Sequence, residues 1–421
     1  MPALTSKQYR FAFIMITSLF FLWGFAHNLD PILIPHLKKS FTLSTLQSSL
    51  IDSAVFIAYF VMALPAGFIM KKYGYKAGII TGLLLFAMGS FLFIPAANTQ
   101  QYIFFLGALF IIACGLTILE TAANPYASLL GDAETSTQRL NFSQSFNGLA
   151  ATLAPIIGAR IILTRDYTEI ELSSMTDAAK KLALSAEAST VKTPYFILGA
   201  IILLVAIIFW FTKLPEIKEG DAHTGTGKGI LHAFRHRHLT WGVVAQFFYV
   251  GAQVCVFSFF ILYATKAAGI DKVTAADYLG WGCGMAFMIG RFAGTFFMKY
   301  IKPERLLAIY SLINILLCAV AIFSSGMMAL YAVIGIAFFM SIMFPTIFSL
   351  GIKDLGADTK FGSSLIIMSI VGGALLPPVF AQIADVTKNI QNGYIVPLVC
   401  FAVILYFGLK GYKVVANNKP E

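Results

Sequence analysis

The chain has few charged side chains for its length of 421 residues, because Asp, Glu, Lys and Arg together make up only 12% of it. Soluble globular proteins contain about 25% of these residues, so the composition excludes an ordinary soluble multidomain protein. Hydrophobic residues make up 58%, and the mean hydropathy is +0.80. Apolar segments of about 20–30 residues recur along the chain, long enough to cross the hydrocarbon layer of a bilayer. The sequence therefore predicts an all-α integral membrane protein embedded in lipid.

Cysteine and histidine are also scarce. The cysteines lie inside apolar segments without close spacing, which predicts small core residues and neither disulfides nor a metal site: they are Cys114, Cys255, Cys283, Cys318 and Cys400. His232, His236 and His238 belong to a basic connector, and we expect no metal there. The net charge is +10, but the basic residues lie in short connectors and not in a stripe interleaved with aromatic residues. Nucleic-acid binding is therefore not expected.

Twelve transmembrane spans are predicted. Their ranges are 9–36, 45–70, 77–97, 102–130, 138–163, 194–212, 240–265, 274–299, 304–324, 328–351, 360–385 and 393–411. Because twelve is even, both termini lie on the same side of the membrane. Nineteen Lys and Arg residues fall on that side and nine fall in the connectors of the other side. An excess of basic residues marks the cytoplasmic side, so both termini are predicted to be cytoplasmic.

A polar connector divides the spans into six and six. We predict an N-terminal half at residues 1–214, a cytoplasmic linker at 215–238 and a C-terminal half at 239–421. Two pairs of similar segments lie 227 and 220 residues apart and support this division: Ala66-Gly67 with Ala293-Gly294, and the segments that begin at Pro125 and Pro345. Two six-helix halves are the plan of major facilitator transporters, which bind substrate near the membrane midplane between the halves.

Glu120 stands in the middle of the fourth predicted span, within LETAANPYASLLGD. A charge at the centre of a span costs about 2.5–3.5 kcal/mol to insert, so ionisable residues there mark ion or substrate paths. Asn124 lies one turn further on the same face. Pro125 cannot donate a backbone hydrogen bond, which frees the Thr121 carbonyl and loosens the helix, and loosened backbone is tolerated where it lines a cavity. The alternatives are a buried hydrogen bond from Glu120 to a neighbouring helix and an ordinary proline kink.

Asp30 repeats this pairing in the first span, because it directly precedes Pro31 and follows Asn28 by two residues. A carboxyl group that moves between wet and dry surroundings can take up and release a proton, since burial disfavours the charged form. We therefore predict that Glu120 and Asp30 are proton-coupling residues. For Asp30, and for Asp52 near the start of the second span, a position at the external interface is the alternative.

Amide and phenol side chains recur at helical spacing in the fifth and seventh spans. Each amide both donates and accepts hydrogen bonds, which suits a neutral ligand with many hydroxyl groups. No histidine is paired with an acid in a way that predicts catalysis, so no enzyme activity is expected. The predicted substrate-binding residues are Asn147, Gln144, Asn124, Asn28, Gln246, Tyr249 and Gln253.

Several segments resemble the L-fucose–proton symporter family of the major facilitators. They are LFFLWGFAHNLDPILIP, PAGFIMKKYGYKAGIITG, LETAANPYASLLGD, RLNFSQSFNG, VGAQ, GRFAGT and FPTIFSLGIKDLG. The resemblance covers nearly the whole chain and implies twelve helices in two halves, a protonatable Glu120, and Gln144 and Asn147 near the sugar. The family departs from this chain in the first span, where it reads Asn-Leu-Asn-Asp-Ile-Leu and its Asp aligns with Pro31.

The resemblance implies a secondary active transporter that imports a neutral monosaccharide, L-fucose above others, together with protons and without a cofactor. Wider relatives carry glucose, galactose or N-acetylglucosamine, and some use Na⁺, so these substrates and this ion are alternatives. A drug–proton antiporter is a further alternative, although its glycine-rich signature in helix five is only faintly echoed by residues 154–158. The expected location is the bacterial inner membrane, where the protein acts as a monomer.

Overall fold

Helices form this chain because a segment in lipid must pair every backbone N–H and C=O group internally. The computed structural model describes residues 5–29, 33, 37, 40–41, 45–162, 171, 174–215 and 230–414. Over these residues every regular element is a helix. The predicted all-α architecture is therefore confirmed.

The N-terminal half contains the first six predicted spans. Its elements are η1 (Lys7–Tyr9), α1 (Arg10–His27), α3 (Thr45–Thr99), α4 (Tyr102–Leu129), η2 (Ala133–Thr135), α5 (Ser136–Ile162), α7 (Asp177–Ala188), η3 (Ser189–Val191) and α8 (Lys192–Phe211). Spans two and three join within α3 at Gly74, whose φ of 84° lies in the left-handed region. Glycine lacks a Cβ and adopts this conformation without strain, so the chain can turn back there.

The C-terminal half contains the other six spans, most of them built from two or three consecutive helices. Its elements are α9 (Ile230–Ala233), α10 (Arg237–Ser258), α11 (Phe260–Ala267), α12 (Lys272–Asp277), the π-helix η4 (Tyr278–Gly284), α13 (Met285–Phe297), α14 (Pro303–Phe323), α15 (Gly326–Met340), α16 (Met343–Gly351), η5 (Gly356–Asp358), α17 (Thr359–Met368), η6 (Ser369–Val371), α18 (Gly372–Thr387), η7 (Ile390–Tyr394), α19 (Ile395–Tyr406) and the π-helix η8 (Phe407–Gly411).

Nine stretches of the described helices are long and apolar enough to cross a membrane, and Ala54–Thr99, with 46 residues, holds two spans. Predicted spans five and eight, which are α5 and α12–α13, are not among the nine. Both carry buried polar side chains, for example Gln144 on α5 and Arg291 on α13. Polar residues inside a membrane protein face the protein interior or a cavity. Polar groups carried into the interior therefore lower the hydropathy of these two spans.

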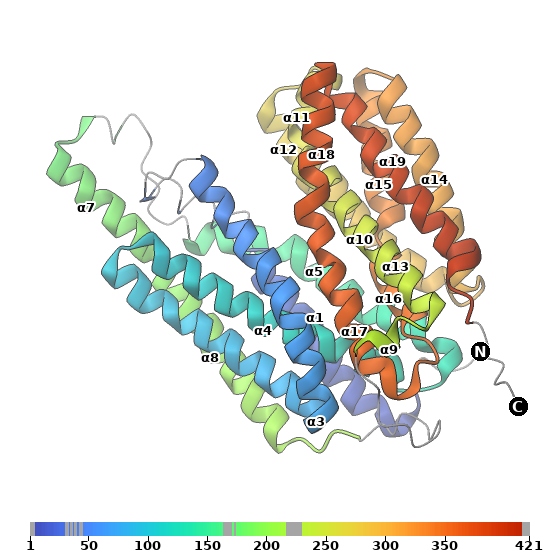
Figure 1. Ribbon diagram of the computed structural model, residues 1–421. Coiled ribbons are helices and arrows are strands. Elements are labelled where there is room, and N and C mark those ends of the chain that lie inside the picture. The colour runs from blue at the N-terminus through green and yellow to red at the C-terminus, as the bar shows by residue number, and fades with distance from the viewer. Residues whose placement is uncertain are drawn as a thin grey trace, which may run out of the picture.

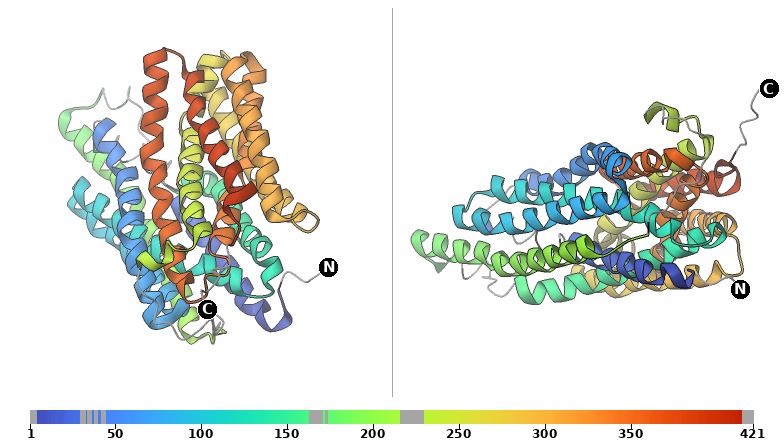
Figure 2. Two further views of the ribbon diagram at one scale, coloured as in Figure 1. Left: turned by 45° about the vertical axis from the view of Figure 1, so that its right-hand side comes forward. Right: turned by 90° about the horizontal axis from the view of Figure 1, so that it is seen from below.

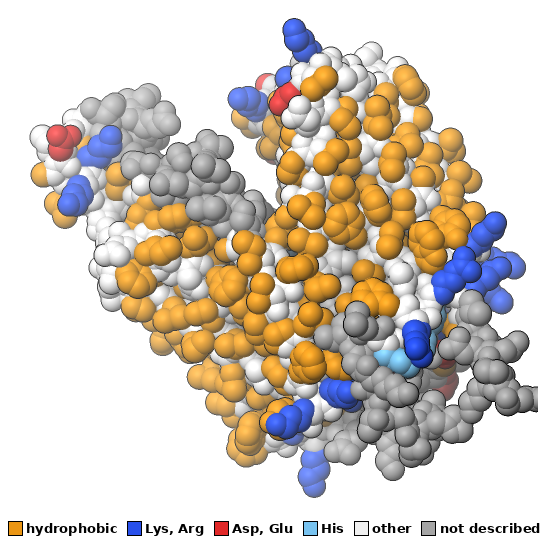
Figure 3. Space-filling view, viewed as in Figure 1, with side chains coloured by type: hydrophobic (Ala, Val, Ile, Leu, Met, Phe, Trp, Pro, Cys, Tyr) orange, Lys and Arg blue, Asp and Glu red, His pale blue; other side chains and the backbone are white. Residues whose placement is uncertain are grey.

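The two halves lie side by side and diverge towards one end, as Figures 1 and 2 show. Both described ends of the chain lie at the opposite end, which we call the terminus side; the other end is the far side. Between the halves, α3 packs against α17, and α5 packs against α13 and α16. In the space-filling view a notch separates the halves at the far side, and hydrophobic side chains form a broad band across both (Figure 3).

Contacts that follow Gly67 on α3 join the halves at the terminus side. A Cβ at Gly67 would clash with Ser364 Oγ on α17. The Phe68 ring packs edge-on against the Phe361 ring, with 5.2 Å between centroids, and the Lys71 ammonium lies 5.0 Å from the centre of the Phe361 ring. Close packing and a cation–π contact therefore hold the halves together at this end.

Within the N-terminal half, α3 and α4 approach most closely at a pair of glycines. A Cβ at Gly115 of α4 would lie 2.5 Å from the Phe86 backbone nitrogen and 2.7 Å from the Gly82 carbonyl oxygen. Small residues are favoured at such helix crossings in membranes because they allow backbones to approach. The crossing fixes the position of α4, which carries Glu120.

We predict that Gly115→Ala lowers the free energy of unfolding by about 1–3 kcal/mol, because the added methyl group overpacks the crossing. Gly107 lies on the same helix, and a Cβ there would meet nothing within 4 Å, so Gly107→Ala is the matched control. Thermal unfolding in detergent should show a lower transition temperature for Gly115→Ala alone. Equal transition temperatures for the two variants would contradict the proposed crossing.

Candidate functional site

Glu120 lies in the middle of α4 with only 8% of its surface exposed. Its carboxyl group is hydrogen-bonded to the hydroxyl of Tyr59 on α3. The second carboxyl oxygen, Oε2, has no hydrogen-bond partner among the described residues. A buried carboxyl group with an unused acceptor is a candidate for binding a proton or a ligand hydroxyl, since buried polar atoms are otherwise nearly always paired.

Arg291 of α13 reaches from the C-terminal half to the N-terminal half. It is 5% exposed; its Nε donates to the Ser341 carbonyl oxygen at 3.0 Å, and its Nη1 donates to the Gln144 carbonyl oxygen at 2.6 Å. The same Nη1 lies 3.5 Å from Asn147 Oδ1. Arg291 also interacts electrostatically with Glu120. This cation therefore connects both halves with the buried acid.

The amides of α4 and α5 form the N-terminal wall of the cluster. Gln144 Nε2 donates to Asn124 Oδ1 at 3.1 Å, and both side chains are buried. Asn147 lies against α1, where a Cβ at Gly24 would come within 2.7 Å of its Nδ2. Asn124 Nδ2 has no hydrogen-bond partner among the described residues. The structure therefore brings three of the predicted substrate-binding residues together beside Arg291.

Two residues of α10 face the cluster from the C-terminal half. Gln246 and Tyr249 are fully buried, and Tyr249 interacts electrostatically with Arg291. The Tyr249 side chain is hydrogen-bonded with Arg291, whereas neither amide atom of Gln246 has a hydrogen-bond partner among the described residues. Such atoms are costly to bury unless something hydrogen-bonds to them. They supply donors and acceptors opposite the amides of α4 and α5.

The other predicted site residues lie further out or cannot be placed. Asn28 ends α1, where its Nδ2 donates to the Gly24 carbonyl oxygen at 2.6 Å, so part of its hydrogen-bonding capacity stabilises its own helix. Gln253 is half-buried, one turn beyond Tyr249 towards the far side. Asp30 and the side chain of Asp52 lie outside the described residues.

The helix around Pro125 differs from the expectation of a loosened helix, because α4 runs without a break from Tyr102 to Leu129. The Thr121 carbonyl that Pro125 leaves without its helical donor instead accepts a hydrogen bond from Ser363 Oγ of α17 at 2.7 Å. A donor from the other half thus replaces the missing helical bond, which removes the reason for the helix to open.

Sequence reasoning did not select Arg291 and Tyr59. An arginine in the middle of a predicted span was a sufficient signal for Arg291, because intramembrane ionisable residues are functional by default. Tyr59 had no such signal, since it is one of 17 tyrosines in an aromatic-rich chain. Its contact with Glu120 joins two spans, and the pattern of neither span indicates it.

The linker histidines bind an acid of the C-terminal half. His232 Nδ1 lies 3.0 Å and His236 Nε2 lies 3.2 Å from Asp358 Oδ2, and His238 Nε2 lies 2.7 Å from the Lys353 carbonyl oxygen. These contacts fasten the C-terminal end of the linker beside η5. The histidines therefore have a structural role away from the polar cluster.

A buried cluster of amides, one acid and one arginine between two six-helix halves defines the class of the protein. The family model described as "Major Facilitator Superfamily" matches residues 11–377, and the chain belongs to this superfamily. Within it, the chain belongs to the L-fucose–proton symporter family, as its relatives show.

The L-fucose-proton symporter of Escherichia coli (strain K12) is 43% identical over 410 residues, which are 96% of this chain and 93% of the relative. The glucose/galactose transporter of Brucella abortus biovar 1 (strain 9-941) is 42% identical over 411 residues, which are 97% and 96% of the two chains. The structure matches the crystal structure of FucP in the outward conformation with a TM-score of 0.89 at 42% identity, covering 96% of this chain and 99% of that chain.

We predict that Ser363→Ala destabilises the protein by about 1–2 kcal/mol, because it leaves the buried Thr121 carbonyl without a donor. Pro125→Ala restores a backbone N–H that can bond to the same carbonyl. The effect of Ser363→Ala should therefore shrink in the Pro125→Ala background, which a double-mutant cycle of unfolding free energies measures.

Ser311→Ala is the control, because Ser311 Oγ donates to the Leu307 carbonyl oxygen of its own helix at 2.7 Å. Its effect should be the same with either residue at position 125. If the effect of Ser363→Ala is also independent of position 125, the Thr121 carbonyl does not link the two halves energetically.

Proposed function

We propose that this multi-pass membrane protein imports a neutral monosaccharide, L-fucose in the first place, together with protons. The observation that carries the proposal is a set of buried polar atoms, contributed by both halves, that have no hydrogen-bond partners among the described residues. They belong to Glu120 and Asn124 of the N-terminal half and to Gln246 of the C-terminal half. A sugar offers several hydroxyl groups, each both donor and acceptor, and can pair with all of them at once.

Glu120 is proposed as the group that carries the proton. It lies among the sugar-binding amides, and Arg291 interacts electrostatically with it. When Glu120 is ionised, Arg291 balances its charge; when Glu120 is protonated, its O–H can donate a hydrogen bond to a sugar oxygen. Protonation and sugar binding then favour each other, and the neutral pair can be enclosed at lower desolvation cost than a carboxylate.

The halves diverge at the far side and touch at the terminus side (Figure 1), as expected for a transporter that receives its substrate from the far side. The basic connectors support a cytoplasmic terminus side, so the far side faces the periplasm of a bacterial inner membrane. Alternating access then requires the contacts of α17 with α3 and α4 to break while the notch closes. The proposed acting unit is the monomer, because the polar cluster is built from a single chain.

A second substrate class is glucose or galactose. The Brucella relative, named a glucose/galactose transporter, is as similar to this chain as the fucose symporter of Escherichia coli. The amide cluster suits any neutral hexose, since amides do not select one arrangement of hydroxyl groups by their chemistry alone. Coupling to Na⁺ is the corresponding alternative for the ion.

We predict that proteoliposomes accumulate labelled L-fucose under an inward pH gradient and that a protonophore abolishes the accumulation. D-galactose, D-glucose and N-acetylglucosamine are tested in parallel, each under a pH gradient and under a sodium gradient. Accumulation of glucose or galactose without fucose would reassign the substrate. Accumulation only under the sodium gradient would reassign the ion.

We predict that Glu120→Gln abolishes accumulation driven by a pH gradient but retains exchange of labelled for unlabelled sugar at equal pH. The glutamine keeps the shape and most hydrogen bonds of a protonated glutamate, but it cannot release a proton. Glu134 is exposed at the terminus side, so Glu134→Gln is the matched control and should accumulate sugar normally. Full accumulation by Glu120→Gln would refute the role of Glu120.

A further inference from the structure

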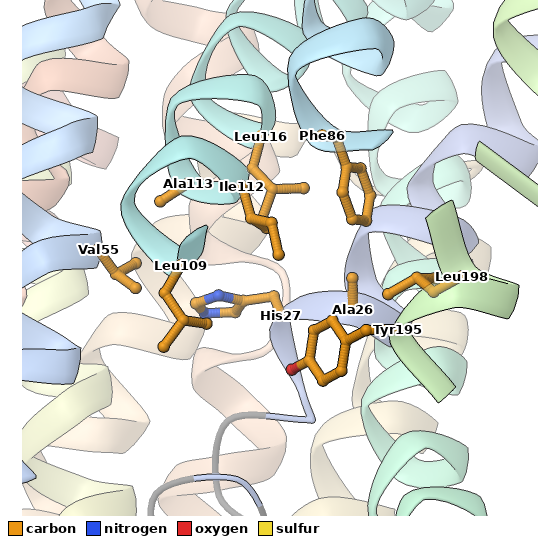
Figure 4. A pocket seen from close by; sticks show the side chains of 10 residues that line it. All are labelled: Ala26, His27, Val55, Phe86, Leu109, Ile112, Ala113, Leu116, Tyr195 and Leu198. Atoms are coloured by element: carbon orange, nitrogen blue, oxygen red, sulfur yellow. The ribbon is translucent and has the colours of Figure 1, made fainter. Parts of the chain in front are cut away.

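A small cavity lies inside the N-terminal half, between α1, α3, α4 and α8. Eight of its ten lining residues are apolar, and the two others are His27 and Tyr195. Figure 4 shows the His27 imidazole inside the cavity, with the Tyr195 hydroxyl on the side of its ring that faces His27. The cavity has room for about one water molecule. The ionisable His27 side chain therefore lies in a mostly apolar cavity of the N-terminal half, which also carries the proposed proton site, Glu120.

The register of two helices places this cavity next to Glu120. On α4 the lining residues Leu109, Ile112 and Leu116 follow one face at helical spacing, and Glu120 is the fourth residue after Leu116. On α3 the lining residue Val55 is followed four residues later by Tyr59, whose hydroxyl is bonded to Glu120. Four residues are about one turn, a rise of about 6 Å. The Tyr59–Glu120 pair therefore lies one turn beyond the cavity on both helices.

The cavity lies on the far side of Glu120. α4 begins at the far side with Tyr102, so its lining residues precede Glu120 on the way from that side. His27 is the last residue of α1, which starts at the terminus side. The His27 side chain is exposed, although its neighbours Ala26 and Leu29 are buried. The imidazole thus lies beside the cavity at the edge of the packed interior, and the cavity is one turn from the acid.

We propose that His27 transfers protons between water on the far side and Glu120. The imidazole accepts a proton from water on one ring nitrogen and releases the proton of the other nitrogen. The released proton passes through water in the cavity and the Tyr59 hydroxyl, which both donates and accepts. Glu120 changes from carboxylate to carboxylic acid, and water on the far side loses one proton. This inference rests on the proposed function and adds the path by which its proton arrives.

The described titratable groups around the cavity come from three of the surrounding helices. α8 contributes Tyr195, while the lining residues of α3 and α4 are apolar; Tyr59 and Glu120 follow one turn further on. Asp30, three residues on in the sequence, lies outside the described residues. The pH dependence of proton delivery is therefore assigned to His27, because a tyrosine hydroxyl ordinarily titrates near pH 10.

The test compares two modes of transport by His27→Gln in proteoliposomes, with labelled L-fucose and D-galactose as probes. Uptake driven by a pH gradient should slow by about tenfold or more, because glutamine cannot carry a proton. The dependence of this uptake on external pH should flatten, because the variant lacks the imidazole that binds and releases protons. Exchange at equal pH on both sides should keep its rate within twofold, since it needs no release of the proton.

Ile103→Ala is the control, because Ile103 of α4 is exposed and does not line the cavity; its pH-driven uptake and pH profile should stay as in the wild type. His27→Asn, a smaller replacement, gives the same test if the glutamine variant does not fold. An unchanged rate and pH profile in the His27 variants overturns the proposal, as does an equal loss of exchange in a folded variant, which would assign His27 to sugar binding.

Uptake by the wild type distinguishes a failure of this proposal from a failure of the proposed function on which it rests. If the wild type transports neither probe under a pH gradient, the proposed function fails and the proton path fails with it. If the wild type is proton-driven and His27→Gln is indistinguishable from it, the path through His27 alone fails.

Discussion

Arg291 projects from α13 into the space between the halves, and its hydrogen bonds end on α5 of one half and on Ser341 of the other. A buried charge costs several kcal/mol unless it is paired and hydrogen-bonded. The halves therefore cannot separate around Arg291 without exposing it to water or giving it another partner. The nearby Glu120 and the amides of α5 supply such partners. The need to pair the charge of Arg291 in the interior thus also restricts how the two halves can be placed relative to each other.

The N-terminal half positions the acid through backbone packing. Gly82 and Gly115 allow the part of α3 after the turn at Gly74 to approach α4, while Tyr59, on the part before that turn, is bonded to Glu120. At the next residue, the Thr121 carbonyl accepts a hydrogen bond from Ser363 of the other half. The acid therefore lies between a contact inside its own half and a contact that joins the halves. A shift of α4 at either contact therefore also moves Glu120, because both contacts are made by the helix that carries it.

The sequence reveals those features whose signal is local. Glu120, Asn124 and Gln144 could be predicted because polar side chains at helical spacing are conspicuous in an apolar chain, and the structure places them together. The hydrogen bond of Ser363 to Thr121 joins residues 242 positions apart, and no periodicity in either segment indicates it. The sequence also does not indicate that α4 stays unbroken at Pro125, because the donor that replaces the missing helical bond lies on α17. Pairings across the halves depend on the assembled bundle.

The linker contact has a mechanical consequence. His232 and His236 hold Asp358, which directly precedes α17. Ser363 lies little more than one turn into that helix, and its hydroxyl donates a hydrogen bond to the Thr121 carbonyl of α4. The connector between the halves is thus linked, through Asp358 and α17, to the Ser363–Thr121 hydrogen bond. This bond must break when the protein opens towards the terminus side. A force or a bound molecule that displaces the connector therefore acts on α17, and through α17 on its hydrogen bond to α4.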